Sequence, residues 1–152
     1  MLAFISLHNL FSGRGEKAHP ASKAIPLEMP SEKQHRIAGV FQAAVERYAS
    51  DLEENAREED EDDDMTRAEK QRAVEFFTVV SSFVSAVRIG VLDVEQAKEP
   101  LAHYGRFGPV YDAIVKKLVD VLRDEGIYNK EGTTVAHVVR EALENVSVYT
   151  ET

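Results

Sequence analysis

The tetrapeptide Gly105-Arg106-Phe107-Gly108 comes nearest, in residue types and spacing, to a ligand-binding motif in this sequence. Two glycines around an arginine can let a loop approach a nucleic-acid backbone, as the GxxG loop of KH domains does. A KH domain also needs a three-stranded sheet, a P-loop needs a longer glycine spacing followed by Lys and Ser or Thr, and a Rossmann fingerprint needs a preceding strand. The surrounding sequence has helical spacing instead. It predicts a bend between two helices, with Phe107 in the core and Arg106 pointing outward.

The other reactive residue types do not assemble a catalytic or metal site in the sequence. The chain has no cysteine, which excludes disulfides, thiolate zinc sites and cysteine nucleophiles. No two histidines have the three- or four-residue spacing that a helical metal site prefers; they are His8, His19, His35, His103 and His137. A metal site shared by His103 and His137 is the remaining alternative. No nucleophile elbow is found, and Glu95, Glu99 and Asp112 are typical surface acids of helices. We therefore expect no enzyme activity, no metal and no cofactor.

Negative charge is concentrated in one stretch of the chain. The net charge is −9, and residues 53–64 (EENAREEDEDDD) alone contribute −8. From Met65 onward 11 bases and 13 acids nearly balance, so the chain as a whole does not attract DNA by its net charge. The acidic run lacks the central glycine and the final glutamate spacing of an EF-hand, which argues against a calcium loop.

A small basic feature is the candidate surface for a partner or for DNA. Its residues are Arg106, Lys116, Lys117 and Arg123. Lys116 and Arg123 lie seven residues apart and are expected on one helix face. The alternative is an ordinary solvated face, on which Asp112 and Asp120 neighbour these bases. Two or three phosphate contacts would support only weak, salt-sensitive binding.

Apolar residues at steps of three and four predict a series of helices. They cover residues 31–56, 66–90, 94–104, 109–125 and 133–147. Capping-box patterns start two of them, with Ser31 and Gln34 in one and Thr66 and Glu69 in the other. Asp93 can cap the helix over 94–104.

Glycine and proline mark where these helices end or begin. Gly90 and Gly126 are natural stops, because glycine tolerates the left-handed conformation that closes a helix. Pro100 lacks an amide hydrogen and should kink the helix over 94–104 or start its final turn. Pro109 suits the first turn of a helix, where a missing amide costs nothing.

The predicted organisation has four parts. Residues 1–30 form an irregular or disordered N-terminal segment, 31–57 a helix, 58–65 an acidic linker, and 66–148 helical hairpins. The segment begins with a short apolar stretch, MLAFISLHNLF, which lacks the basic flank and clear cleavage site of a secretion signal. No window approaches the roughly 18 to 20 apolar residues that span a membrane.

The predicted fold class is all-α. Four helices joined by short turns are expected to form two antiparallel hairpins, each the size of an armadillo or HEAT-type repeat. A plain helical bundle is the structural alternative. The apolar arc of the helix over 66–90 is wide, and we expect that Phe76, Phe77 and Phe83 cannot all be covered, which would leave the isolated chain marginally stable.

Long segments of the chain resemble the C-terminal region of fungal stromal-antigen-type cohesin subunits. The most specific are LAHYGRFGPVYDAIVKKLVDVLRDEG (101–126) and TVAHVVREAL (134–143), and GVFQAAVERYASDLEE (39–54) before an acidic run also resembles that family. The resemblance covers roughly residues 31–148. It extends over long segments and includes no catalytic signature.

The resemblance implies a curved solenoid of HEAT-type helix pairs, of which this chain would be one late slice. It implies a non-catalytic scaffold in the nucleus, on chromosomes, which binds the kleisin subunit and other cohesin proteins and supports sister chromatid cohesion. DNA would be contacted through the full-length protein, and neither a membrane nor a small molecule is an expected partner. The alternatives are an unrelated helical adaptor that binds peptide helices and a small DNA-binding helical module.

Overall fold

The structure is a computed structural model that describes residues 29–55, 67–127 and 132–150, with side chains up to residue 146. The predicted acidic linker and Thr66 of the second capping box lie outside these residues. Residues 1–28 of the predicted irregular N-terminal segment also lie outside the described residues.

Every regular element within the described residues is helical, so the predicted all-α class is confirmed. The elements are α2 (Ser31–Asn55), α3 (Arg67–Arg88), the 3₁₀ helix η2 (Val94–Ala97), α4 (Lys98–Leu101), α5 (Gly108–Val115), α6 (Lys117–Ile127) and α7 (Gly132–Thr150). None of these helices combines the length and apolarity needed to cross a bilayer.

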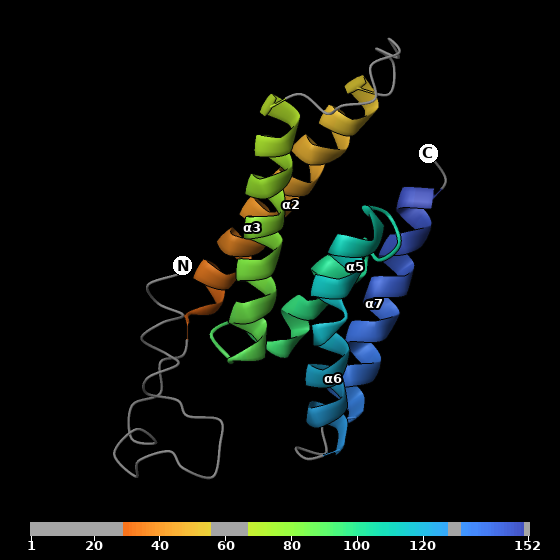
Figure 1. Cartoon of the computed structure of the whole chain (residues 1–152). Helices are drawn as coiled ribbons and strands as arrows, with labels where there is room; N and C mark the ends of the chain where they lie inside the picture. The colour runs from red at the N-terminus through yellow and green to blue at the C-terminus, as the bar shows by residue number, and fades with distance from the viewer. Residues whose placement is uncertain (1–28, 56–66, 128–131, 151–152) are drawn as a thin grey trace.

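Helix α3 is central to the arrangement. It runs antiparallel to α2, and α6 runs antiparallel to α7 (Figure 1). α3 also packs against α5 and α6, whereas η2 and α4 pack against α7. The main antiparallel partner of α3 is thus α2, and the segment over 94–104, expected to be that partner, is instead a short connection beside α7.

The helix predicted over residues 94–104 is shorter than expected. It consists of one 3₁₀ turn, η2, followed by the single turn α4, and the chain continues as turns up to Phe107. Pro100 is buried within α4 and has no amide hydrogen, so it removes a backbone hydrogen bond from this stretch. Pro100 thus lies in the last helical turn before the bend, and the predicted kink stays a prediction.

The helix predicted over residues 109–125 is divided at Lys116. The amide of Lys116 donates to the carbonyl of Asp112 (2.8 Å), as in an α-helix, but the amide of Val119 donates to the carbonyl of Lys116 (3.0 Å). That three-residue step replaces a four-residue one and separates α5 from α6.

Two predicted helix caps are wrong because their residues bind each other. Gln34 is buried (4% exposed), and its side-chain amide contacts Asp93 instead of closing a box with Ser31. Asp93 makes no side-chain cap on η2, since its carboxylate accepts from Gln34. The start of α2 is closed by backbone amides, with Lys33 and Gln34 both donating to the carbonyl of Pro30 (2.9 and 3.1 Å).

Gly90 ends α3 as predicted, through a Schellman motif. Its φ of 79° is left-handed, and its amide donates to the carbonyl of Val87 (3.1 Å). The amide of Val91 donates to the carbonyl of Ala86 (2.9 Å), and both of these side chains are buried. These are the two bonds, with their apolar contact, that define the motif.

Aromatic side chains fill the core between α2, α3 and α5. Phe83 packs on Phe41 with ring centroids 4.6 Å apart, and Phe76 stacks on Tyr48 at 4.1 Å. Phe76 and Phe83 are buried and Phe77 is only partly buried, so the three phenylalanines of α3 are not all covered, as expected. The marginal stability expected from this stays a prediction. The opposing ring on Phe76 and on Phe83 comes from α2, because α2 and not the segment over 94–104 pairs with α3.

Candidate functional site

The GRFG corner is a bend, as predicted. Gly105 and Gly108 have φ values of 81° and 82°, in the left-handed region, and Pro109 occupies the first turn of α5. The amide of Gly105 donates to the Oδ1 atom of Asp112 (2.8 Å). That carboxylate occupies the place an anion would take at this amide, so the corner is not arranged as a phosphate loop.

Phe107 is buried at the bend and packs among the core rings, as predicted. Its ring centroid lies 5.3 Å from those of Phe76 and Tyr111, and the Arg106 guanidinium lies over its outer side, 5.1 Å from the centroid. Tyr111 donates its hydroxyl to the carbonyl of Pro100 (2.8 Å), and burial raises the pKa of this phenol. The corner is thus held by packing and by internal hydrogen bonds.

His103 is a buried histidine beside this cluster. It is 1% exposed, and its Nδ1 atom lies 3.4 Å from an Nη1 atom of Arg106. Burial, with a smaller contribution from the Arg106 charge, lowers the pKa of His103 to about 4. The side chain is therefore neutral at physiological pH. His137 is on α7, where its Nδ1 atom lies 3.1 Å from Arg140.

The four predicted basic residues are all exposed but occupy different settings. Arg106 lies on the bend, Lys116 at the junction of α5 and α6, and Lys117 at the start of α6. Arg123 makes an ion pair with Asp120, with Nη1 3.1 Å from Oδ1. The shared face of Lys116 and Arg123 and a role of the quartet in DNA binding stay predictions.

An open apolar groove lies between α6 and α7. It has a volume of about 400 Å³. Its lining residues are Leu101, Val119, Leu122, Arg123, Val135, Val139, Ala142, Leu143 and Val146. Arg123 is the one charged side chain among these described residues, so the groove is apolar with a single basic group.

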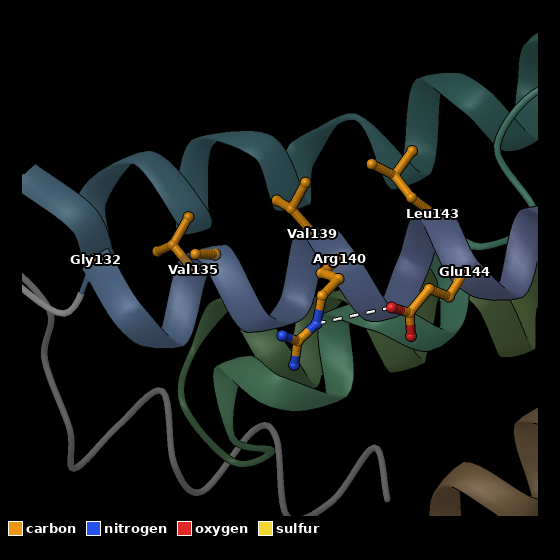
Figure 2. Close-up of a pocket in the computed structure, with 7 residues that line it drawn as sticks. Gly132, Val135, Val139, Arg140, Leu143 and Glu144 are labelled. Atoms are coloured by element: carbon orange, nitrogen blue, oxygen red, sulfur yellow. Dashed lines mark ion pairs between the residues drawn. The ribbon is translucent and has the colours of Figure 1, made fainter.

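The wall of the groove on α7 is a ridge of three apolar residues, Val135, Val139 and Leu143. They follow one another at four-residue steps and lie in a row along α7 (Figure 2). Val139 and Leu143 are 42% and 65% exposed. A wider hollow of about 730 Å³ flanks the ridge on its other side, where Arg140 and Glu144 form an ion pair (3.8 Å). The ridge therefore stands between two hollows, which is the shape that helix packing uses.

Apolar spacing predicted the helix over 133–147, but only some of its apolar residues are buried. Val138 and Ala142 are buried against η2, α4 and α6, whereas Val139 and Leu143 face outward. The apolar positions of α7 span an arc wider than one packed face needs. That width is the sequence signal for a second, open face, and it is the same kind of signal noted for the helix over 66–90. No comparable sequence signal marked Val119 of α6 as a lining residue.

The lining of the groove suits the apolar face of a docked helix or extended segment. A small-molecule pocket usually includes several polar groups that orient its ligand, and here Arg123 is the one charged lining group. An amphipathic helix in a groove is instead recognised by apolar anchors at steps of three, four and seven residues. Among the described residues, no cluster of three or more His, Asp or Glu side chains is arranged to hold a metal ion.

Comparisons with protein-family models, with curated proteins and with solved structures found no match to this chain. The groove and the sequence segments that build it are therefore the basis for a functional proposal.

Proposed function

We propose that the chain is a non-catalytic helical-repeat scaffold of the cohesin type, which binds a kleisin segment and acts on chromosomes in the nucleus. Two things support the proposal: the resemblance of residues 101–126 and 134–143 to stromal-antigen-type subunits, and the open groove between α6 and α7. The segments that carry the resemblance form α5, α6 and most of the described part of α7, and so build the groove.

The observation that carries the proposal is the exposure of the ridge on α7. Val139 and Leu143 together present apolar surface that a compact helical bundle would cover. In a repeat protein each helix pair buries such a face against a neighbour or a partner. An apolar segment of a kleisin would fill the groove in the same way, with its own apolar residues on either side of the ridge.

Calorimetric titration with a kleisin fragment tests the proposal. We expect binding that is lost in Val139→Asp and Leu143→Asp, because each places a carboxylate among apolar groups and the one basic group of the lining, Arg123, is already paired with Asp120. Val74→Asp is the matched control, since Val74 is 61% exposed on α3 and lies away from the groove lining. No binding of kleisin to the unaltered chain would refute the proposal. Equal binding to all four proteins would refute the groove as its site.

A general helical adaptor is the second candidate, because the groove lining contains few groups that could select one sequence. One basic group and eight apolar or small residues set few conditions on the sequence of a bound helix. Binding of unrelated amphipathic helices with the same affinity as kleisin would favour the adaptor over the cohesin scaffold.

A DNA-binding module requires that Lys116→Glu with Lys117→Glu abolish a salt-sensitive affinity for duplex DNA.

A further inference from the structure

We propose that the apolar segment of residues 1–11 of this same chain docks in the groove between α6 and α7 and covers it until a partner displaces it. Residues 1–11 lie outside the described part of the chain, so the argument depends on their sequence, on the length of the connection and on where that connection ends. The proposal is independent of whether the displacing partner is a kleisin.

The sequence of the segment matches the groove in chemistry. MLAFISLHNLF contains no Asp, Glu, Lys or Arg. Phe4, Leu7 and Phe11 have the i, i+3, i+7 spacing of the anchors with which a helix binds an apolar groove. The other undescribed segments do not offer such a face, because residues 12–28 contain charges and prolines, residues 56–66 are strongly acidic, and residues 128–131 and 151–152 are too short.

The connection ends close to the groove. The Nε2 atom of Gln34 donates both to the carbonyl of Met29 and to the carboxylate of Asp93, each at 2.9 Å, so Met29 is held beside the start of η2. η2 and α4 then lead from Asp93 to Leu101, which lines the groove. Eight residues in these two short helices span at most about 14 Å.

The connection is also long enough. Residues 12–28 are 17 residues, which extend to roughly 56 Å at about 3.3 Å per residue. A connection of this length holds its end at an effective concentration on the order of millimolar. Three apolar anchors are then sufficient for occupancy within one chain, even where a free peptide of the same sequence would bind weakly.

The absence of cysteine allows a direct test in the full chain by nuclear magnetic resonance. Ser6→Cys provides a single attachment point for a nitroxide, which broadens signals of nearby nuclei. At low protein concentration we expect the methyl signals of Val135, Val139 and Leu143 to broaden, and those of Val74 on α3 to stay sharp. Loss of the broadening is expected when Phe4→Asp and Leu7→Asp are added.

Two controls separate this proposal from its rivals. Asn9→Asp adds a negative charge outside the anchor positions and should leave the broadening unchanged. In a mixed sample, one copy carries the nitroxide without isotope enrichment and the other is enriched without the nitroxide. The signals of the enriched copy should not broaden. Sharp α7 signals in the labelled chain would overturn the proposal. Broadening that appears in the mixed sample and rises with concentration would also overturn it, because it would identify a second copy as the occupant.

Discussion

Gln34 of α2 and Asp93 at the start of η2 bind each other through two hydrogen bonds of 2.9 Å, although 59 residues separate them in the sequence. The Oε1 atom of Gln34 accepts from the amide of Asp93, and its Nε2 atom donates to the carboxylate. The same Nε2 atom also donates to the carbonyl of Met29. One buried amide thereby joins the start of α2 to the corner that follows α3.

Gln34→Ala should lower the free energy of unfolding by about 1–3 kcal/mol, because it removes three hydrogen bonds and leaves polar groups of Asp93 and Met29 without these partners. Chemical denaturation measures this change. A double-mutant cycle with Asp93→Ala should give a coupling energy of about 0.5–1.5 kcal/mol, less than the full effect because the backbone amide of Asp93 remains. Additive effects of the two substitutions would contradict the contact.

This pair also indicates what could be predicted from the sequence. Helices and their stops follow local rules, so the apolar spacing of α3, the left-handed Gly90 and the first-turn Pro109 were all predicted. Gln34 and Asp93 each match a local capping pattern, yet each has its partner in a distant segment. A long-range hydrogen bond of this kind leaves no trace in local spacing.

The division at Lys116 and the open ridge on α7 were missed for different reasons. No glycine or proline marks the division between α5 and α6, so the local sequence predicts one helix. The residues of the ridge were identified as apolar, but periodicity cannot tell which of two adjacent apolar faces is covered. Tertiary packing decides that: Val138 lies against neighbouring elements, and Val139 does not.

Gly105→Ala and Gly108→Ala should each lower the free energy of unfolding by about 1–2 kcal/mol. Both glycines have φ near 80°, which an L-residue adopts at a cost of that size, and a new Cβ atom would meet no atom within 4 Å. The effect is therefore one of backbone conformation. Gly39→Ala is the matched control: it also meets no atom within 4 Å but lies inside α2, so it should raise stability by up to about 1 kcal/mol. The same sign of change at all three glycines, in thermal melts, would contradict this explanation.

Acidification should destabilise the chain through His103. Its pKa is about 4 in the folded chain and about 6.5 when unfolded, so the unfolded state binds more protons between these values. The contribution of neutral His103 is fully present above pH 6.5 and is lost as the pH falls to 4, by up to about 3 kcal/mol. Denaturation midpoints across pH 4 to 7 measure this loss.

His103→Leu is the control for this pH dependence. The variant lacks the titrating group, so its stability should change less between pH 6.5 and 4 than that of the unaltered chain. Carboxylates that titrate in the same range contribute equally to both proteins and cancel in the difference. An identical pH dependence in the two proteins would show that His103 is accessible to protons in the fold.

Val138 and Leu143 of α7 should differ in how much their truncation destabilises the chain. Val138 is fully buried, and Val138→Ala should lower the free energy of unfolding by about 2 kcal/mol, from two lost methyl groups and the space they leave. Leu143 is 65% exposed among the described residues, so in a Phe4→Asp, Leu7→Asp background, where residues 1–11 are not expected to dock, Leu143→Ala should change the free energy of unfolding by no more than about 0.5 kcal/mol. Urea denaturation of both variants makes the comparison, since each truncates one aliphatic side chain on the same helix. In the unaltered chain a larger loss at Leu143 is expected, because docked residues 1–11 would cover this side chain. A loss that persists when Phe4→Asp and Leu7→Asp are present would contradict the exposure of the ridge, because it would come from packing within the helical core. Equally small changes at Leu143 in both backgrounds would contradict the docking of residues 1–11.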